Sequence, residues 1–172
     1  MPNKKSRKKF AGRNKRLYKL LMFFIRLNVF AIPLYTVLYS GYQSALLMDV
    51  TTKLAYQMIS GSMDASLQGN IITIPVENGF WGARVSWDST GWKSALAMAA
   101  LILATDFPLR KKIYGLLLLP LVYAANILRI WLMFFAVKSY GIAYFSLFHT
   151  VIWSWGLIFT ILVLWAVWMK YL

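Results

Sequence analysis

The chain has 172 residues, of which 60% are hydrophobic, and its formal net charge is +14. Apolar runs long enough to cross a bilayer exclude an ordinary soluble domain, and the length leaves room for one compact unit. The sequence holds no cysteine and one histidine, which excludes disulfides, thiolate metal sites and a histidine-rich metal cluster. We therefore predict an all-α integral membrane protein that uses no metal and no cofactor.

The N-terminal residues 1–19 form a basic tail. Nine of the 19 basic residues lie between Lys4 and Lys19, ahead of the first apolar run. Such a cluster is typical of a positive-inside topology signal that also attracts anionic membrane lipids, and this interpretation is favoured over nucleic-acid binding. We predict a cytoplasmic tail, a single transmembrane domain over residues 20–172, and no nucleic-acid partner.

The first predicted span covers residues 20–39. Its length of about 20 apolar residues, with no clean cleavage site after it, favours a retained anchor over a signal peptide. Pro33 is expected to kink this helix, and Arg26 is expected to extend toward the inner headgroups.

Residues 45–59 are predicted to form an amphipathic helix at the outer interface. Asp49, Lys53 and Gln57 recur at four-residue spacing, opposite an apolar stripe. The stripe consists of Leu46, Leu47, Val50, Leu54 and Met58. The following residues 61–87 mix Gly, Ser, Asn and Pro with a short alternating stretch, which predicts a small extracytoplasmic cap with one extended segment or hairpin.

Three further spans are predicted over residues 89–107, 113–137 and 147–169, which gives about four transmembrane helices and two cytoplasmic termini. The cytoplasmic side is marked by a basic group after the second span, made up of Arg110, Lys111 and Lys112. Asp106 is expected to balance that group. The predicted location is the cell membrane, multi-pass, with the outer ends of spans two to four at the same face.

Ser89 begins the second predicted span. Unpaired N–H groups and the helix dipole at that point would stabilise the negative charge that develops on a nucleophile. The alternative is that Ser89 is only an N-cap, a position that serine favours. Ser89 alone does not decide between the two interpretations.

Arg129 lies about eight residues below the outer end of the third span, too deep to be comfortable without a partner or a wet cavity. Asn126, one turn earlier, shares its helix face and is a candidate to bind the guanidinium or a substrate carbonyl. A structural alternative pairs Arg129 with an inward Asp88 or with backbone carbonyls.

His149 is the single histidine and lies near the outer start of the fourth span, with Trp153 and Gly156 following on the same helix face. Its titration range suits general acid and base catalysis. The alternative is an interfacial histidine that binds a headgroup or a loop. The topology brings His149 toward Ser89 and Arg129, which favours a catalytic role.

Three segments in this order resemble the motifs of the exosortase and archaeosortase family of prokaryotic membrane transpeptidases. They are Asp88-Ser89-Thr90-Gly91-Trp92-Lys93-Ser94, then Asn126-Ile127-Leu128-Arg129-Ile130, then His149. In that family the first motif carries a cysteine nucleophile, the second an arginine and the third a histidine. The resemblance covers residues 87–156 and implies the catalytic set Ser89, Arg129 and His149. The candidate substrate-binding residues beside them are Asp88, Thr90, Trp92 and Asn126.

The chain departs from the family at the nucleophile, where Ser89 stands in place of cysteine. A hydroxyl is a far weaker nucleophile than a thiolate near neutral pH. Two interpretations follow. Either the serine is an engineered replacement that inactivates the enzyme, or it is natural and His149 activates it as in serine hydrolases.

The resemblance implies that position 89 attacks a peptide carbonyl, that His149 carries the proton to the leaving amine, and that Arg129 stabilises the oxyanion. The implied partners are exported proteins with a C-terminal motif, a transmembrane helix and a basic tail. A lipid or surface acceptor then receives the cleaved protein. Two rival hypotheses remain: an intramembrane serine protease with a Ser89 and His149 dyad, and a non-catalytic binder of substrate tails.

Overall fold

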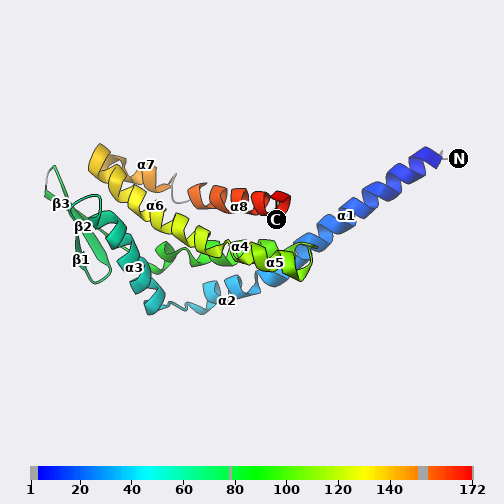
Figure 1. The fold of residues 1–172 in the computed structure, drawn as a ribbon, viewed down its shortest axis with the longest axis horizontal. Helices are drawn as coiled ribbons and strands as arrows, with labels where there is room; N and C mark the ends of the chain where they lie inside the picture. The colour runs from blue at the N-terminus through cyan, green and yellow to red at the C-terminus, as the bar shows by residue number, and fades with distance from the viewer. Residues whose placement is uncertain (1–3, 78, 151–154, 172) are drawn as a thin grey trace.

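The computed structural model describes residues 4–77, 79–150 and 155–171, and most of them are helical (Figure 1). The helices are α1 (Lys4–Phe30), α2 (Ile32–Ser40), α3 (Ala45–Ser60), α4 (Trp92–Ala104), α5 (Leu109–Leu116), α6 (Leu119–Tyr140), α7 (Phe145–Thr150) and α8 (Leu157–Tyr171). Two short 3₁₀ helices are η1 (Trp87–Thr90) and η2 (Ile142–Tyr144). The strands are β1 (Ser66–Gln68), β2 (Ile71–Val76) and β3 (Gly79–Arg84).

Helices α1 and α2 follow one another with a short interruption at Ala31. Pro33 lies in the first turn of α2, where its missing N–H removes no intrahelical hydrogen bond. The N–H of Ala31 donates to the carbonyl of Leu27, and the carbonyl of Ala31 accepts from Tyr35, so hydrogen bonding continues across the break. Residues 14–40 are long and apolar enough to cross a membrane.

Helix α3 confirms the helix predicted over residues 45–59. The Ser44 hydroxyl caps it by accepting from the N–H of Leu47 at 3.2 Å. Its buried face, however, is not the predicted apolar stripe: Thr51, Ala55 and Ile59 are buried against the rest of the molecule. The stripe of Leu46, Val50, Leu54 and Met58 is exposed. Such a surface suits a lipid environment, because there apolar side chains need not be buried inside the protein.

The segment after α3 holds more strand than the single extended segment or hairpin predicted for it. It forms a three-stranded antiparallel sheet in the order β1-β2-β3. Gly69, with φ +57°, turns the chain so that Gln68 pairs with Ile71. Ile72 and Ile74 of β2 are fully buried and pack with Phe134 of α6. The sheet is thereby fixed to the end of α6 that continues into η2 and α7.

The remaining helices correspond only in part to the predicted spans. Residues 109–140, which comprise α5 and α6, are long and apolar enough to span a membrane, whereas α4 and α8 are shorter apolar helices. At 1.5 Å per residue, the 13 residues of α4 extend roughly 20 Å, less than the bilayer core. The predicted number of about four spans therefore stays a prediction.

The end of the bundle opposite the sheet is built around buried Trp168 of α8. Its indole N–H donates to the Lys111 carbonyl at 3.1 Å, and Gly115 leaves the space that the ring fills. The sequence predicted that Asp106 would balance the neighbouring basic group. Asp106 instead forms an ion pair with Arg26 of α1. The partner lies 80 residues away in the sequence, which is why local charge patterning missed it.

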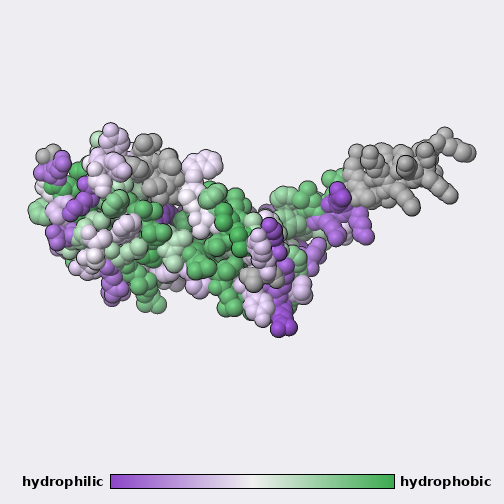
Figure 2. Space-filling view, turned by 45° about the horizontal axis from the view of Figure 1, so that its top comes forward, coloured by the Kyte–Doolittle hydropathy of each residue, from purple (hydrophilic) through white to green (hydrophobic). Residues whose placement is uncertain are grey.

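Hydrophobic residues gather over the middle of the molecule in Figure 2, and hydrophilic residues gather toward the sheet end and toward the end formed by α5. An apolar zone between two polar ends is the surface expected of a membrane protein.

Candidate active site

Ser89 lies in the tight turn η1, between the sheet and α4. Its N–H donates to the Ser86 carbonyl at 2.9 Å, and the Thr90 hydroxyl donates to the Trp87 carbonyl at 2.9 Å. The N-cap of α4 is Gly91, and no side chain caps that helix. The interpretation of Ser89 as an N-cap is therefore wrong. The reason is that the chain makes one more turn before the helix begins.

Gly91 is required by both conformation and space. Its φ is +79°, a region that other residues rarely adopt, and a Cβ atom at this position would meet Asn126 Cγ at 2.7 Å. The close approach brings the turn directly onto α6, so that one glycine sets the distance between Ser89 and the helix that carries Arg129.

The carbonyl oxygen of Ser89 accepts hydrogen bonds from two side chains of α6. Asn126 Nδ2 donates to it at 2.9 Å and Arg129 Nη2 at 3.4 Å. Asn126 is fully buried, and Ser89 and Arg129 are almost so. The contact agrees with the alternative in which Arg129 binds a backbone carbonyl. Asp88, the other partner named in that alternative, forms an ion pair with Lys93 at 2.8 Å.

A pocket of about 410 Å³ is lined by Ser89, Arg129 and His149 together. His149 is half-buried, and its ring lies 5.3 Å from that of Phe145, one turn earlier on α7. An aromatic and apolar wall completes the pocket, with Trp81, Met133, Phe134 and Phe145 among its residues. Trp153, predicted to share the face of His149, lies outside the described residues.

The predicted substrate-binding residues fall into two groups. Asp88 lines the pocket, whereas Asn126 and Thr90 are fully buried and hold the turn through hydrogen bonds to backbone carbonyls. Trp92 is buried next to the turn, and its indole N–H finds no hydrogen-bond acceptor among the described residues. Their contact with substrate stays a prediction.

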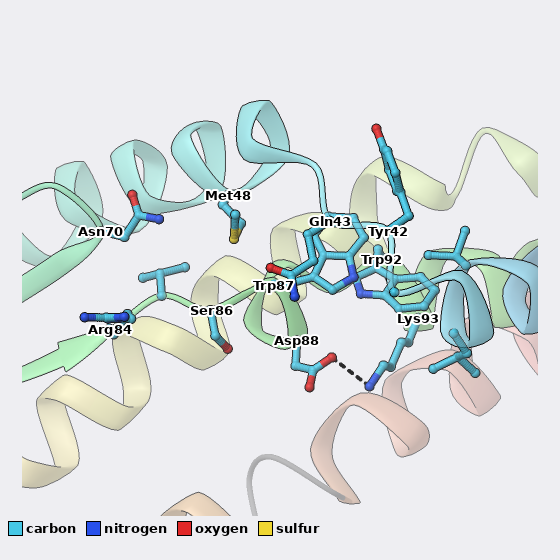
Figure 3. Close-up of a pocket in the computed structure, with 14 residues that line it drawn as sticks. Tyr42, Gln43, Met48, Asn70, Arg84, Ser86, Trp87, Asp88, Trp92 and Lys93 are labelled. Atoms are coloured by element: carbon cyan, nitrogen blue, oxygen red, sulfur yellow. Dashed lines mark ion pairs between the residues drawn. The ribbon is translucent and has the colours of Figure 1, made fainter.

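A second pocket, of about 570 Å³, lies on the other side of the segment that carries Ser86 and Asp88 (Figure 3). Trp87 and Trp92 stack at 5.3 Å, and Tyr42 meets Trp87 edge-on at 6.2 Å. The figure shows Asp88 and Lys93 pointing toward one another. The indole stack therefore forms part of the wall of this pocket and supports the turn from the side of α2.

Sequence reasoning missed Ser86. Its hydroxyl oxygen lies 3.0 Å from that of Ser89, and it lines both pockets. The available signal was its spacing, because residues three apart in a tight turn lie close together. Arg84 and Lys93 also line the pocket and were not among the predicted site residues, although Lys93 lies in the quoted motif.

Among the described residues, no group of three or more His, Cys, Asp or Glu side chains is placed to bind a metal ion. The predicted catalytic residues bring a hydroxyl, a guanidinium and an imidazole to the pocket. These groups suit acyl transfer, in which one attacks a carbonyl, one carries a proton and one stabilises an oxyanion.

Comparison with known proteins identifies a family. Residues 11–170 match the family model of the transmembrane exosortases. No curated protein and no solved structure matches the chain. The match covers nearly the whole chain, from the basic tail through the sheet and the pocket to the last helix. The chain therefore belongs to the transmembrane exosortase family and is a membrane protein.

Proposed function

We propose that this exosortase is a membrane-embedded transpeptidase that cleaves C-terminal sorting signals of exported proteins and transfers the cleaved protein to a lipid or surface acceptor. The observation that carries the proposal is the pocket lined jointly by Ser89, Arg129 and His149. These residues come from three separate elements, η1, α6 and α7. Family membership supports the same class of reaction.

In the proposed first step, the side chain at position 89 attacks the scissile carbonyl, and His149 accepts its proton. The C–N bond then breaks, and His149 returns the proton to the leaving amine. The product is an acyl-enzyme. Arg129 stabilises the oxyanion, because it lines the pocket beside Ser89 and a guanidinium donates hydrogen bonds to negatively charged oxygens.

In the second step, an acceptor amine or hydroxyl attacks the acyl group and His149 removes the acceptor's proton. The acyl bond to position 89 breaks, the side chain regains a proton, and the exported protein becomes attached to the acceptor. Transfer to water instead would make the protein a protease. The chain as it stands carries serine at the nucleophile position, and we propose that this form is inactive or nearly so.

The proposed orientation places the basic tail in the cytoplasm and the sheet end outside. The basic residues of α5, Arg110, Lys111 and Lys112, lie at the end of the molecule opposite the sheet, in agreement with the positive-inside rule (Figure 1). A substrate tail held as a membrane helix would then present its outer end at the depth of the pocket.

The test is mass spectrometry of the C-termini of exported proteins in host cells that carry this chain, its Ser89→Cys form, or that form with His149→Ala. We expect processing by the cysteine form and its loss without His149. Ser86→Cys is the matched control, because it places a thiol in the same pocket three residues away and should not restore processing. Processing by the serine chain itself, lost in Ser89→Cys, would instead support the intramembrane serine protease. No processing by any form would support the non-catalytic binder.

A further inference from the structure

Within the part of the chain that the structure describes, strand β3 has one edge that is not paired with another strand. The sheet has the order β1-β2-β3, so that β2 is central and β3 is a terminal strand (Figure 1). Helix α3 packs on β1 and β2, and helix α6 packs on β2. An unpaired strand edge presents backbone donors and acceptors that can bind another extended chain.

The register identifies the backbone groups on that edge. The N–H of Val85 donates to the Asn70 carbonyl at 2.8 Å, so the backbone N–H and C=O groups of Val85 point toward the β2 side of the strand. Backbone groups alternate along a strand, and those of Arg84 and Gly82 therefore point away from β2. Pro75 of β2, which has no backbone N–H, is consistent with this alternation. It pairs with Phe80 at a position where β2 donates no hydrogen bond to β3.

The same edge borders the pocket that contains Ser89. Ala83, Arg84, Val85 and Ser86 all line this pocket. Ala83 and Arg84 are neighbours in β3, and Val85 and Ser86 follow the end of the strand. Because the side chains of Ala83 and Arg84 point to opposite faces of the sheet, a pocket that both residues line is bordered by the backbone edge between them. The free donors and acceptors of β3 thus lead directly to the candidate nucleophile.

We propose that the substrate segment on the N-terminal side of the scissile bond binds as a fourth strand, parallel to β3, through the backbone groups of Gly82 and Arg84. This inference rests on the proposed function, because it assigns the way in which that same pocket takes its substrate. Main-chain hydrogen bonds supply affinity, and the side chains of the pocket wall select among sequences.

The direction of the added strand follows from the order of elements. Strand β3 runs toward the turn with Ser89, and the chain continues into the apolar helix α4. A substrate with an extended segment, a scissile bond and a membrane helix has the same order. Laid parallel to β3, it brings its scissile bond to Ser89 and its helix into the bilayer beside α4. The antiparallel direction would carry its helix away from the membrane.

The experiment compares Arg84→Ala with Arg84→Pro, both in the Ser89→Cys form, by the mass-spectrometric assay. Both variants lose the guanidinium, but only proline also removes the outward N–H. We expect about tenfold less processing with proline than with alanine, as for one lost hydrogen bond. The matched control is Leu67→Ala against Leu67→Pro on β1, whose outer edge is remote from the pocket. That pair should process substrate equally.

Equal processing by Arg84→Ala and Arg84→Pro would overturn the inference and leave the proposed function intact. No processing by Ser89→Cys with Arg84 in place would overturn the proposed function and the inference with it.

A second measurement covers the case in which Arg84→Pro does not fold. A synthetic peptide that copies the residues before the observed cleavage site is N-methylated at one position at a time, and its binding to the Ser89 chain is measured. Loss of binding at every second position supports the added strand, and loss without this period overturns it.

Discussion

The two ends of the bundle differ in how their polar groups are packed. At the α5 end, Arg26 pairs with Asp106, and Trp168 packs tightly while its N–H donates to the Lys111 carbonyl. At the sheet end, Arg129 is buried beside an open pocket and shares the Ser89 carbonyl with Asn126. The first end is packed for stability, and the second holds charge and polar groups around a space. Substitutions at the α5 end should therefore affect stability alone, whereas substitutions at the sheet end should also affect activity.

The largest contrast is expected between the two arginines, each replaced by lysine in the Ser89→Cys form. Arg129→Lys should lower processing at least about 100-fold, because lysine lacks the forked geometry that binds two oxygens at once. Arg26→Lys keeps a cation beside Asp106 and should leave processing unchanged. Mass spectrometry of product C-termini measures both. An equal loss in the two variants would remove the distinction between the ends.

A second contrast compares Gly91 and Gly115, each of which lies too close to a neighbouring side chain to accommodate a Cβ atom. A Cβ at Gly91 would meet Asn126, and a Cβ at Gly115 would meet Trp168, each at 2.7 Å. Alanine at either position should cost about 2–3 kcal/mol of unfolding free energy through overpacking. In the Ser89→Cys form, only Gly91→Ala should also reduce the activity per folded molecule, since it moves the turn that carries position 89. Thermal unfolding in detergent combined with the processing assay separates the two effects. Normal specific activity in folded Gly91→Ala would contradict this.

A smaller effect is expected from Asn126→Ala in the Ser89→Cys form, because this substitution removes one hydrogen bond to the carbonyl of residue 89. The expected loss of processing is about tenfold, because a buried acceptor loses one of its two side-chain donors. Tyr123→Phe is the control on the same helix: it removes the 2.9 Å contact with Thr51, away from the pocket. If the two variants lose activity equally, Asn126 acts only through general stability.

The smallest effect is expected from the exposed ion pairs. Lys93 pairs with Asp88, and Lys53 pairs with Asp49, each at 2.8 Å. Glutamine at Lys93 or at Lys53 should change the unfolding free energy by less than about 1 kcal/mol, as for other surface pairs. In the Ser89→Cys form, only Lys93→Gln should also lower processing, by about threefold, because Lys93 lines the pocket. A larger change in stability at either position would show that the pair is shielded from water.

Much of the helical framework could be predicted from hydrophobic periodicity, as at α3 and at the first long apolar segment. The sheet was underestimated, because β1 has only three residues and its pairing depends on a glycine turn. The partner of Asp106 lies too far away in the sequence to be inferred from local charge.

The residues of the pocket followed from the rarity of polar groups in apolar segments, which singled out Ser89, Arg129 and His149. Two other features of the pocket, Ser86 and the edge of β3, could not be predicted in this way. Ser86 gave no such signal because it lies outside the apolar segments, and the edge of β3 has no side-chain signature. Backbone edges and interactions between distant elements are products of the tertiary fold, so composition and spacing do not reveal them.

The shared acceptor at Ser89 also has a mechanical consequence. Membrane helices change tilt when the thickness of the surrounding bilayer changes. Because two side chains of α6 bind the main chain of Ser89, the candidate nucleophile, a tilt of α6 would carry Ser89 and Arg129 together. We therefore expect the alignment of these two groups to depend less on bilayer thickness than the position of His149, which lies on a separate helix.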